Sequence, residues 1–166
     1  TCKTVNSSMK IKSHILYLLS FLGLCACGTD YYFEKYYDID NAVWTYDNTL
    51  DYEIDIQDTS SIYDLYLNLQ HSPEYPYQNL YIRIQTHFPK GEKLEETLSV
   101  NLANKAGLWH GDCNTQRCKL QIPIQEGAFF NQAGSYRFTI EQYMRVPALE
   151  GIRQIGMALK DTGMKR

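Results

Sequence analysis

The sequence predicts an all-β protein, an antiparallel β-sandwich of about seven to eight strands with an immunoglobulin-like or jelly-roll arrangement. Fourteen tyrosines in 166 residues favour pleated, half-buried surfaces, because aromatic side chains pack well on them. From Leu50 onward, apolar and polar residues alternate with a period of two, which is typical of half-buried strands. No segment after residue 26 has the 3.6-residue apolar period of an amphipathic helix. A chain of this length corresponds to one folded domain.

The N-terminal residues predict a secretory signal at residues 9–26. Met9 opens a short basic segment that contains Lys10 and Lys12, and residues 15–26, ILYLLSFLGLCA, are almost wholly apolar. That run is shorter than the roughly 20 apolar residues that span a bilayer. A basic head, a short apolar middle and small residues at the end are typical of a cleaved signal, so this segment is excluded from the fold.

The signal ends at a cysteine in the pattern of a bacterial lipobox. Leu24 stands three positions before Cys27, and Ala26 stands directly before it. Cys25 fits less well, because it would place the bulky Leu24 where the signal peptidase requires a small side chain. We therefore expect cleavage before Cys27 and lipidation of its side chain and amino group. These acyl chains would anchor the protein, since each buried methylene contributes about 0.8 kcal/mol.

The residues that follow Cys27 predict a tether at 27–45, because they contain many tyrosines and acids without a clean period. The folded domain is expected at residues 46–166. Removal of residues 1–26 takes away three lysines and no acids, which lowers the net charge from −3 to −6. This charge argues against a nucleic-acid partner. Gly28, in place of the aspartate that retains lipoproteins at the inner membrane, favours the outer membrane.

Seven segments with the two-residue period are predicted as strands. They are LDYEIDIQ (50–57), YDLYLNLQ (63–70), LYIRIQTHF (80–88), LEETLSVNL (94–102, with Leu94, Leu98, Val100 and Leu102 inward), CKLQIPIQ (118–125), SYRFTIEQ (135–142) and IRQIGMALK (152–160). FPKGEK (88–93) predicts a hairpin turn, since Pro89 interrupts the ladder and Gly91 admits a positive φ. Pro123 predicts an edge or bulged strand. Each strand is apolar on one side only, so two sheets must pack face to face.

Two cysteines remain in the body of the protein, Cys113 and Cys118. In an oxidising cell envelope such a pair can form a disulfide, and the intervening NTQR resembles a turn. A zinc site that includes His110 is the alternative, but it lacks a fourth ligand at a recognisable spacing.

Catalytic motifs are absent from the sequence. It contains no Gly-x-Ser-x-Gly elbow, no phosphate-binding glycine loop and no His-Glu-x-x-His pair. Glu95 and Glu96 alternate along a predicted strand and therefore point to opposite faces, which disfavours a glycosidase pair. We predict no enzymatic activity, no metal site and no cofactor beyond the covalent lipid at Cys27.

Four tyrosines form the candidate interaction face. Tyr66 and Tyr81 lie on the polar sides of successive predicted strands, and Tyr75 and Tyr77 lie in the segment between them. Exposed tyrosines suit both protein contacts and stacking against sugars. They also pair across strands and steady a solvated sheet. The sequence leaves these three roles open.

Four stretches behind the lipobox carry a resemblance to a known family. They are YDLYLNLQHSPEYPYQNLYIRIQTHFPKG, GLWHG, GSYRFTIEQYMR and LEGIRQIGMALK, in this order. As a set, they resemble the gliding-motility lipoprotein GldH family over nearly the whole mature chain. The segment DCNTQRC departs from the family pattern, so its cysteine pair would be a local elaboration.

The resemblance implies a lipid-anchored cell-envelope protein, similar to components needed for surface gliding and tied to a protein-secretion system. It implies other envelope or gliding-machinery proteins as partners, and no molecular activity. A glycan- or ligand-binding lipoprotein that uses the exposed tyrosines is the alternative function.

Overall fold

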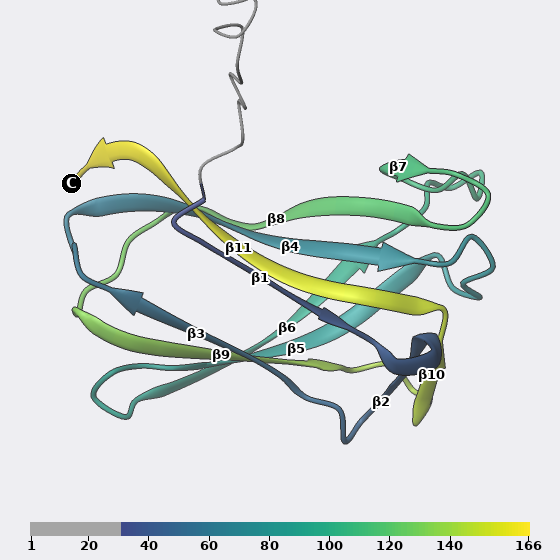
Figure 1. Ribbon diagram of the computed structural model, residues 1–166, viewed down its shortest axis with the longest axis horizontal. Helices are drawn as coiled ribbons and strands as arrows, with labels where there is room; N and C mark the ends of the chain where they lie inside the picture. Colours follow the sequence, from purple (N-terminus) through teal and green to yellow (C-terminus); the bar gives the residue numbers. More distant parts are fainter. Residues whose placement is uncertain (1–30) are drawn as a thin grey trace, which may run out of the picture.

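The computed structural model describes residues 31–166, so Leu24, Ala26 and Cys27 lie outside the described residues. The chain forms two antiparallel sheets packed face to face (Figure 1). The five-stranded sheet has the spatial order β1 (Phe33–Asp38), β11 (Ile152–Lys165), β4 (Ser61–His71), β8 (Cys118–Ala128) and β7 (Asp112–Cys113). The four-stranded sheet has the order β3 (Leu50–Ile56), β9 (Gly134–Gln142), β5 (Asn79–His87) and β6 (Lys93–Asn101). The predicted all-β sandwich is confirmed.

Two short strands and one helical turn complete the described chain. β2 (Val43–Thr45) pairs with β10 (Ala148–Glu150), and the 3-10 helix η2 (Asp40–Ala42) precedes β2. Trp44 of β2 is fully buried, and its indole N–H donates to the carbonyl of Asn48 at 2.7 Å. No helix within residues 31–166 is long and apolar enough to cross a membrane.

The two-residue alternation builds the core between the sheets. In β3 every second residue is buried, from Leu50 to Ile56, and the intervening acids are exposed. β4 contributes the opposing layer, in which Leu67 and Leu69 are at most 2% exposed. Burial of one such side chain stabilises the fold by about 1.5–3 kcal/mol.

All seven predicted strands are present, as β3, β4, β5, β6, β8, β9 and β11. Gly91 has a φ of 92° in the predicted hairpin turn, and its N–H donates to the carbonyl of Phe88 at 2.9 Å. β8 lies near the sheet edge, because β7 pairs with it only at Lys119 and Cys118. Its register with β4 shifts beside Pro123. The interpretation of Pro123 as a mark of an edge or bulged strand is therefore confirmed.

The sandwich begins earlier than predicted, so the tether prediction for residues 27–45 is wrong from residue 33 onward, where β1, η2 and β2 follow one another. β1 pairs antiparallel with β11, from Phe33 opposite Leu159 to Asp38 opposite Gln154. The strand was missed because tyrosines occupy both of its faces, which hides the alternation. Tyr37 packs against the core, whereas Tyr36 is 44% exposed on the outer surface.

One inward position of β6 is not buried. Leu94 is 47% exposed, whereas Val100, further along the same strand, is buried. β6 is an edge strand of its sheet, and Leu94 lines an open cleft between the two sheets.

Candidate interaction surface

The four predicted tyrosines do not share one face. Tyr66 lies on β4 and points outward from the five-stranded sheet, and Tyr81 lies on β5 and points outward from the four-stranded sheet. The two sheets lie face to face (Figure 1). Because both tyrosines alternate with the buried residues of their strands, their side chains point away from the core on opposite sides of the sandwich. Both side chains point outward, as the alternation of apolar and polar residues predicts. However, β4 and β5 belong to different sheets, although they are successive in the chain.

Tyr75 is a core residue and is only 3% exposed. Its ring lies 5.7 Å from those of His71 and Tyr77, and its hydroxyl donates to the carbonyl of Asn79 at 3.1 Å. Burial raises the pKa of the Tyr75 hydroxyl. Gly151, at a φ of 92°, passes against this ring, and a Cβ atom there would lie 3.2 Å from the Tyr75 Cα. Tyr75 therefore holds the connection between β4 and β5, and Tyr77 packs partly against it.

Tyr81 belongs to a cluster of exposed aromatic and apolar side chains from β5 and the loop after β9. Tyr81 is 41% exposed and Tyr143 is 49% exposed. The Tyr143 N–H donates to the Tyr81 carbonyl at 2.8 Å, and the Tyr81 N–H lies 3.3 Å from the Met144 sulfur. The Tyr46 hydroxyl donates to the Met144 carbonyl at 2.6 Å. We name this cluster the tyrosine patch; it consists of Tyr46, Tyr77, Tyr81, Tyr143, Met144, Arg145 and Val146.

Arg83 restrains the Tyr143 ring of the tyrosine patch. Its guanidinium carbon lies 4.8 Å from the centre of the Tyr143 ring, and it forms an ion pair with Glu141. Glu95 lies 3.6 Å from the same guanidinium. The hydrogen bond to Glu141 raises the pKa of Arg83. A charged group that is both paired and stacked holds the exposed ring in one orientation.

The outer face of the five-stranded sheet has a different chemistry. Tyr36, Gly156, Asn68 and Gln121 form one row across four neighbouring strands. The Asn68 side-chain N–H donates to the Tyr36 hydroxyl at 3.1 Å, and the Gln121 side-chain N–H donates to the Asn68 side-chain oxygen at 2.9 Å. The Tyr36 ring lies across Gly156, where a Cβ atom would clash with it.

A hollow of about 360 Å³ lies beside this row, and it is lined by Tyr36, Asn68, Leu69, Gln70, Lys119, Leu120, Gln121 and Gln154. Tyr66 lies one row away, opposite Ala158 of β11. We name this surface the amide face, because uncharged amides and hydroxyls predominate there. Burial, together with a hydrogen bond to Glu34, raises the pKa of Tyr36, so its hydroxyl stays protonated.

Cys113 and Cys118 form a disulfide with an S–S distance of 2.06 Å. The two residues face each other in the short β7–β8 hairpin. Asn114 supports the turn, because its side-chain oxygen accepts the N–H groups of Gln116 and Arg117 at 2.8 and 3.0 Å. In the described part of the chain, no cluster of three His, Cys, Asp or Glu side chains could hold a metal ion.

Sequence reasoning missed Tyr46, Tyr143 and Met144 as members of the tyrosine patch. Tyr143 and Met144 lie in the stretch GSYRFTIEQYMR, which was used only for the resemblance. The pairing of β9 with β5 brings this stretch beside Tyr81. The adjacent residues Tyr143 and Met144 directly follow a predicted strand, and this was the available signal for the cluster.

Comparison with known proteins gives two curated relatives of nearly the same length. The chain is 28% identical over 159 residues to "Gliding motility lipoprotein GldH" of Flavobacterium johnsoniae, covering 92% of this chain and 98% of that protein. It is 24% identical over 155 residues to "Gliding motility lipoprotein GldH homolog" of Christiangramia forsetii, covering 89% and 94%.

Among solved structures, the chain is similar to TmCBM61 in complex with β-1,4-galactotriose, with a TM-score of 0.34 and 9% identity over 77% of this chain and 81% of that one. A likeness at this level carries no inference about function. The family comparison is decisive, because the model of the GldH lipoprotein family matches residues 31–159, from the start of the described chain into β11. The chain therefore belongs to the GldH lipoprotein family.

Proposed function

We propose that this protein is a membrane-anchored envelope lipoprotein that acts, without catalysis, as an interaction component of gliding machinery or of the associated protein-secretion machinery. Family membership and the names of its relatives support this proposal. Cys27 carries the lipid, Leu24 and Ala26 direct signal cleavage, and Gly28 favours the outer membrane.

The tyrosine patch is the observation that carries the interaction role. Tyrosine, methionine and arginine are enriched at protein interfaces, and the patch combines all three around a hollow of about 560 Å³. Hydrogen bonds from Tyr46 and Tyr143 hold its loop in place. A surface ordered before binding loses less conformational entropy when a partner docks. The patch therefore suits a protein partner that inserts an apolar side chain.

Co-purification of the intact lipoprotein with envelope proteins, followed by rebinding of each identified partner, tests this role. Tyr81→Ala and Tyr143→Ala should each cost about 2 kcal/mol of binding or more, which is about a 30-fold loss of affinity. Their melting temperatures should stay near that of the parent protein. Tyr66→Ala, on the opposite sheet, is the matched control. Unchanged affinity in both patch variants would remove the patch from the interface.

Glycan binding is the second candidate function. The amide face supports it better than the predicted face of Tyr66, Tyr75, Tyr77 and Tyr81 does. Amides and hydroxyls match the donors and acceptors of a polyol. The exposed Tyr36 ring, lying across Gly156, offers a surface on which a sugar can stack. Retention of the intact lipoprotein on immobilised cell-surface polysaccharide should fall in Tyr36→Ala and Gln121→Ala and persist in Tyr81→Ala. Equal retention in all three variants would exclude the amide face.

A further inference from the structure

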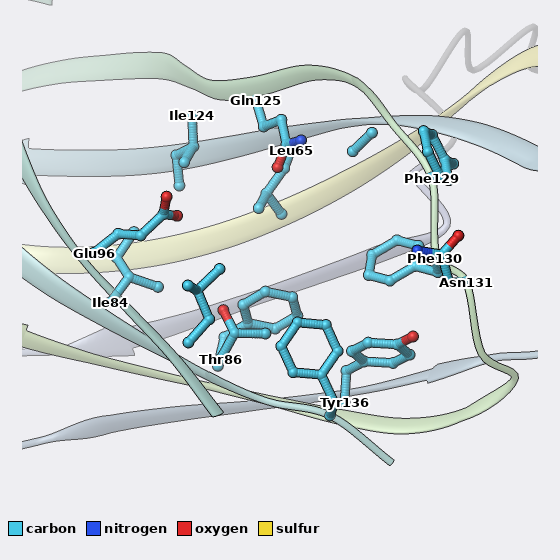
Figure 2. A pocket seen from close by; sticks show the side chains of 14 residues that line it. Leu65, Ile84, Thr86, Glu96, Ile124, Gln125, Phe129, Phe130, Asn131 and Tyr136 are labelled. Carbon is cyan, nitrogen blue, oxygen red and sulfur yellow. The ribbon is translucent and has the colours of Figure 1, made fainter. Parts of the chain in front are cut away.

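A cleft of about 220 Å³ opens between the two sheets at one end of the sandwich (Figure 2). Leu65 and Ile124 extend into it from the five-stranded sheet, and Ile84, Thr86 and Tyr136 extend from the four-stranded sheet. The segment from Phe129 to Asn131, which connects β8 to β9, closes one side. The cleft is therefore a gap in the core that side chains of both sheets line but do not fill.

The chemistry of the cleft fits a hydrocarbon. Its polar side chains are Thr86, Glu96, Gln125, Asn131 and the Tyr136 phenol, and the other nine lining residues are aliphatic or aromatic. An apolar protein cavity of about 150 Å³ stays dry and binds benzene. A cleft of the present size has room for a longer hydrocarbon segment.

The rim of the cleft is also apolar. Leu94 is 47% exposed and Phe129 is 51% exposed, one on each side. About half of each side chain faces water, and a ligand that lies between them would cover more of both. A linear chain that enters the cleft would pass along both residues.

The cleft lies at the end of the sandwich where the described chain begins. Five aromatic rings cross this end in a row: Tyr32, Tyr63, Phe130, Tyr136 and Phe88, with successive centres 5.3, 5.6, 4.8 and 5.6 Å apart. The last three line the cleft. Tyr32 is five residues after Cys27, and five residues span at most about 18 Å. A lipid on Cys27 would therefore keep this end of the sandwich close to the bilayer.

Arg166 lies at the rim of the cleft. The guanidinium carbon of Arg166 lies 4.9 Å from the centre of the Phe129 ring, and its Nη1 donates to the Asn131 side-chain oxygen at 3.2 Å. Glu96 supplies a carboxylate to the lining of the cleft. An acyl chain inside the cleft would place its head group at the rim, where Arg166 can meet an anionic oxygen.

We propose that this cleft binds one acyl chain, supplied either by a membrane phospholipid or by the lipid on Cys27. Binding would seat the anchored end of the sandwich on the bilayer. The inference rests on the proposed lipid anchoring for its location and on the cleft itself for its chemistry.

Photo-crosslinking of the intact lipoprotein distinguishes the two sources. In one arm, the protein is mixed with phosphatidylethanolamine and phosphatidylglycerol vesicles that contain a phospholipid with a diazirine in its acyl chain. In the other, cells are fed diazirine-labelled palmitate, so that the lipid on Cys27 carries the label. Adducts of phospholipid mass on the peptides around Thr86 or Phe130 identify a membrane lipid. A crosslink from the N-terminal peptide to the same peptides identifies the protein's own lipid.

Filling the cleft provides the decisive comparison. Ala128→Phe from β8 and Thr86→Trp from β5 should each lower the cleft adducts by about tenfold or more, because added side-chain volume excludes the chain. Ala106→Phe, an exposed alanine outside the cleft lining, is the matched control and should keep them. Thermal melting shows which filled variants fold. Because the two substitutions lie on different sheets, the test still works if one of the variants does not fold.

Absence of cleft adducts in both arms would overturn the inference, and so would adducts that persist when folded variants have a filled cleft. The mass of the N-terminal peptide reports lipidation of Cys27 separately. A lipidated protein without cleft adducts therefore rejects the cleft and leaves the proposed anchoring intact. An unlipidated protein that still captures the vesicle phospholipid rejects the anchoring and retains the cleft.

Discussion

Gly156→Ala should destabilise the sandwich through a single contact, the one between β11 and the Tyr36 ring. A Cβ atom at Gly156 would clash with Cδ1 and Cε1 of that ring. Tyr36 would have to rotate away, which would break the hydrogen bond from Asn68. Overpacking costs about 1–3 kcal/mol, and the lost hydrogen bond adds about 1 kcal/mol. We expect a loss of about 2–4 kcal/mol of unfolding free energy.

The same substitution should have the opposite sign when Tyr36 is already alanine. Without the ring, nothing else from the described chain opposes a methyl group at that position as closely. Alanine inside a strand is favoured over glycine by roughly 0.5–1 kcal/mol. The double-mutant cycle should therefore give an interaction energy of about 2.5–5 kcal/mol, which is large for a pair of residues in contact.

Urea unfolding of the four proteins in the cycle measures this energy, with tryptophan fluorescence as the signal. The slopes of unfolding free energy against urea should agree among the four, so that the midpoints compare the native states. A loss of similar size from Gly156→Ala in both backgrounds would refute the reasoning, because the cost would then lie in β11 itself.

Three further predictions concern the lipid, the disulfide and a buried histidine. Cys27→Ser should lose incorporation of a fatty-acid label and release the protein from membranes, whereas Cys25→Ser should keep both; label in Cys27→Ser would contradict the lipobox assignment. Unreduced peptides from envelope-extracted protein should contain Cys113 linked to Cys118, and reduction should cost at most about 2 kcal/mol for so short a loop; two free thiols would contradict the bond. Burial lowers the pKa of His71, so the unfolded chain, with a pKa near 6.5, takes up the proton first and stability should fall below about pH 6.5. His71→Phe should flatten that dependence in urea titrations, and an unchanged slope would assign it to other groups.

The sequence predicts strands well wherever one face is apolar and the other is polar. β3 is the clearest case, because acids alternate with buried residues from Leu50 to Ile56 without interruption. β1 escaped prediction since tyrosines lie on both of its sides, and a tyrosine suits the core and the surface equally. Leu94 shows a different limitation. The alternation correctly places it on the inner side of β6, but no side chain of the opposite sheet covers it fully, and it remains 47% exposed.

The sequence could not predict which strands share a sheet. This assignment determines which side chains lie together in each candidate site. Tyr66 and Tyr81 have the same outward parity on successive strands, yet the crossover from β4 to β5 puts them on opposite sides of the molecule. Tyr143 joins Tyr81 only through the long-range pairing of β9 with β5. The cleft depends on the same arrangement, since its lining comes from five strands and connections that are distant in the chain.

The strands β5 and β9 connect the tyrosine patch to the cleft. Tyr81 of the tyrosine patch lies near the start of β5, and Phe88 of the cleft directly follows the end of β5. β9 runs antiparallel to β5 in the same sheet (Figure 1). Seven residues of strand cover about 24 Å. If the cleft end is held at the bilayer, the patch is presented at about that height above it, away from the lipid. Under the proposed function, the sheet would then fix the distance between the bilayer and a partner protein bound at the patch.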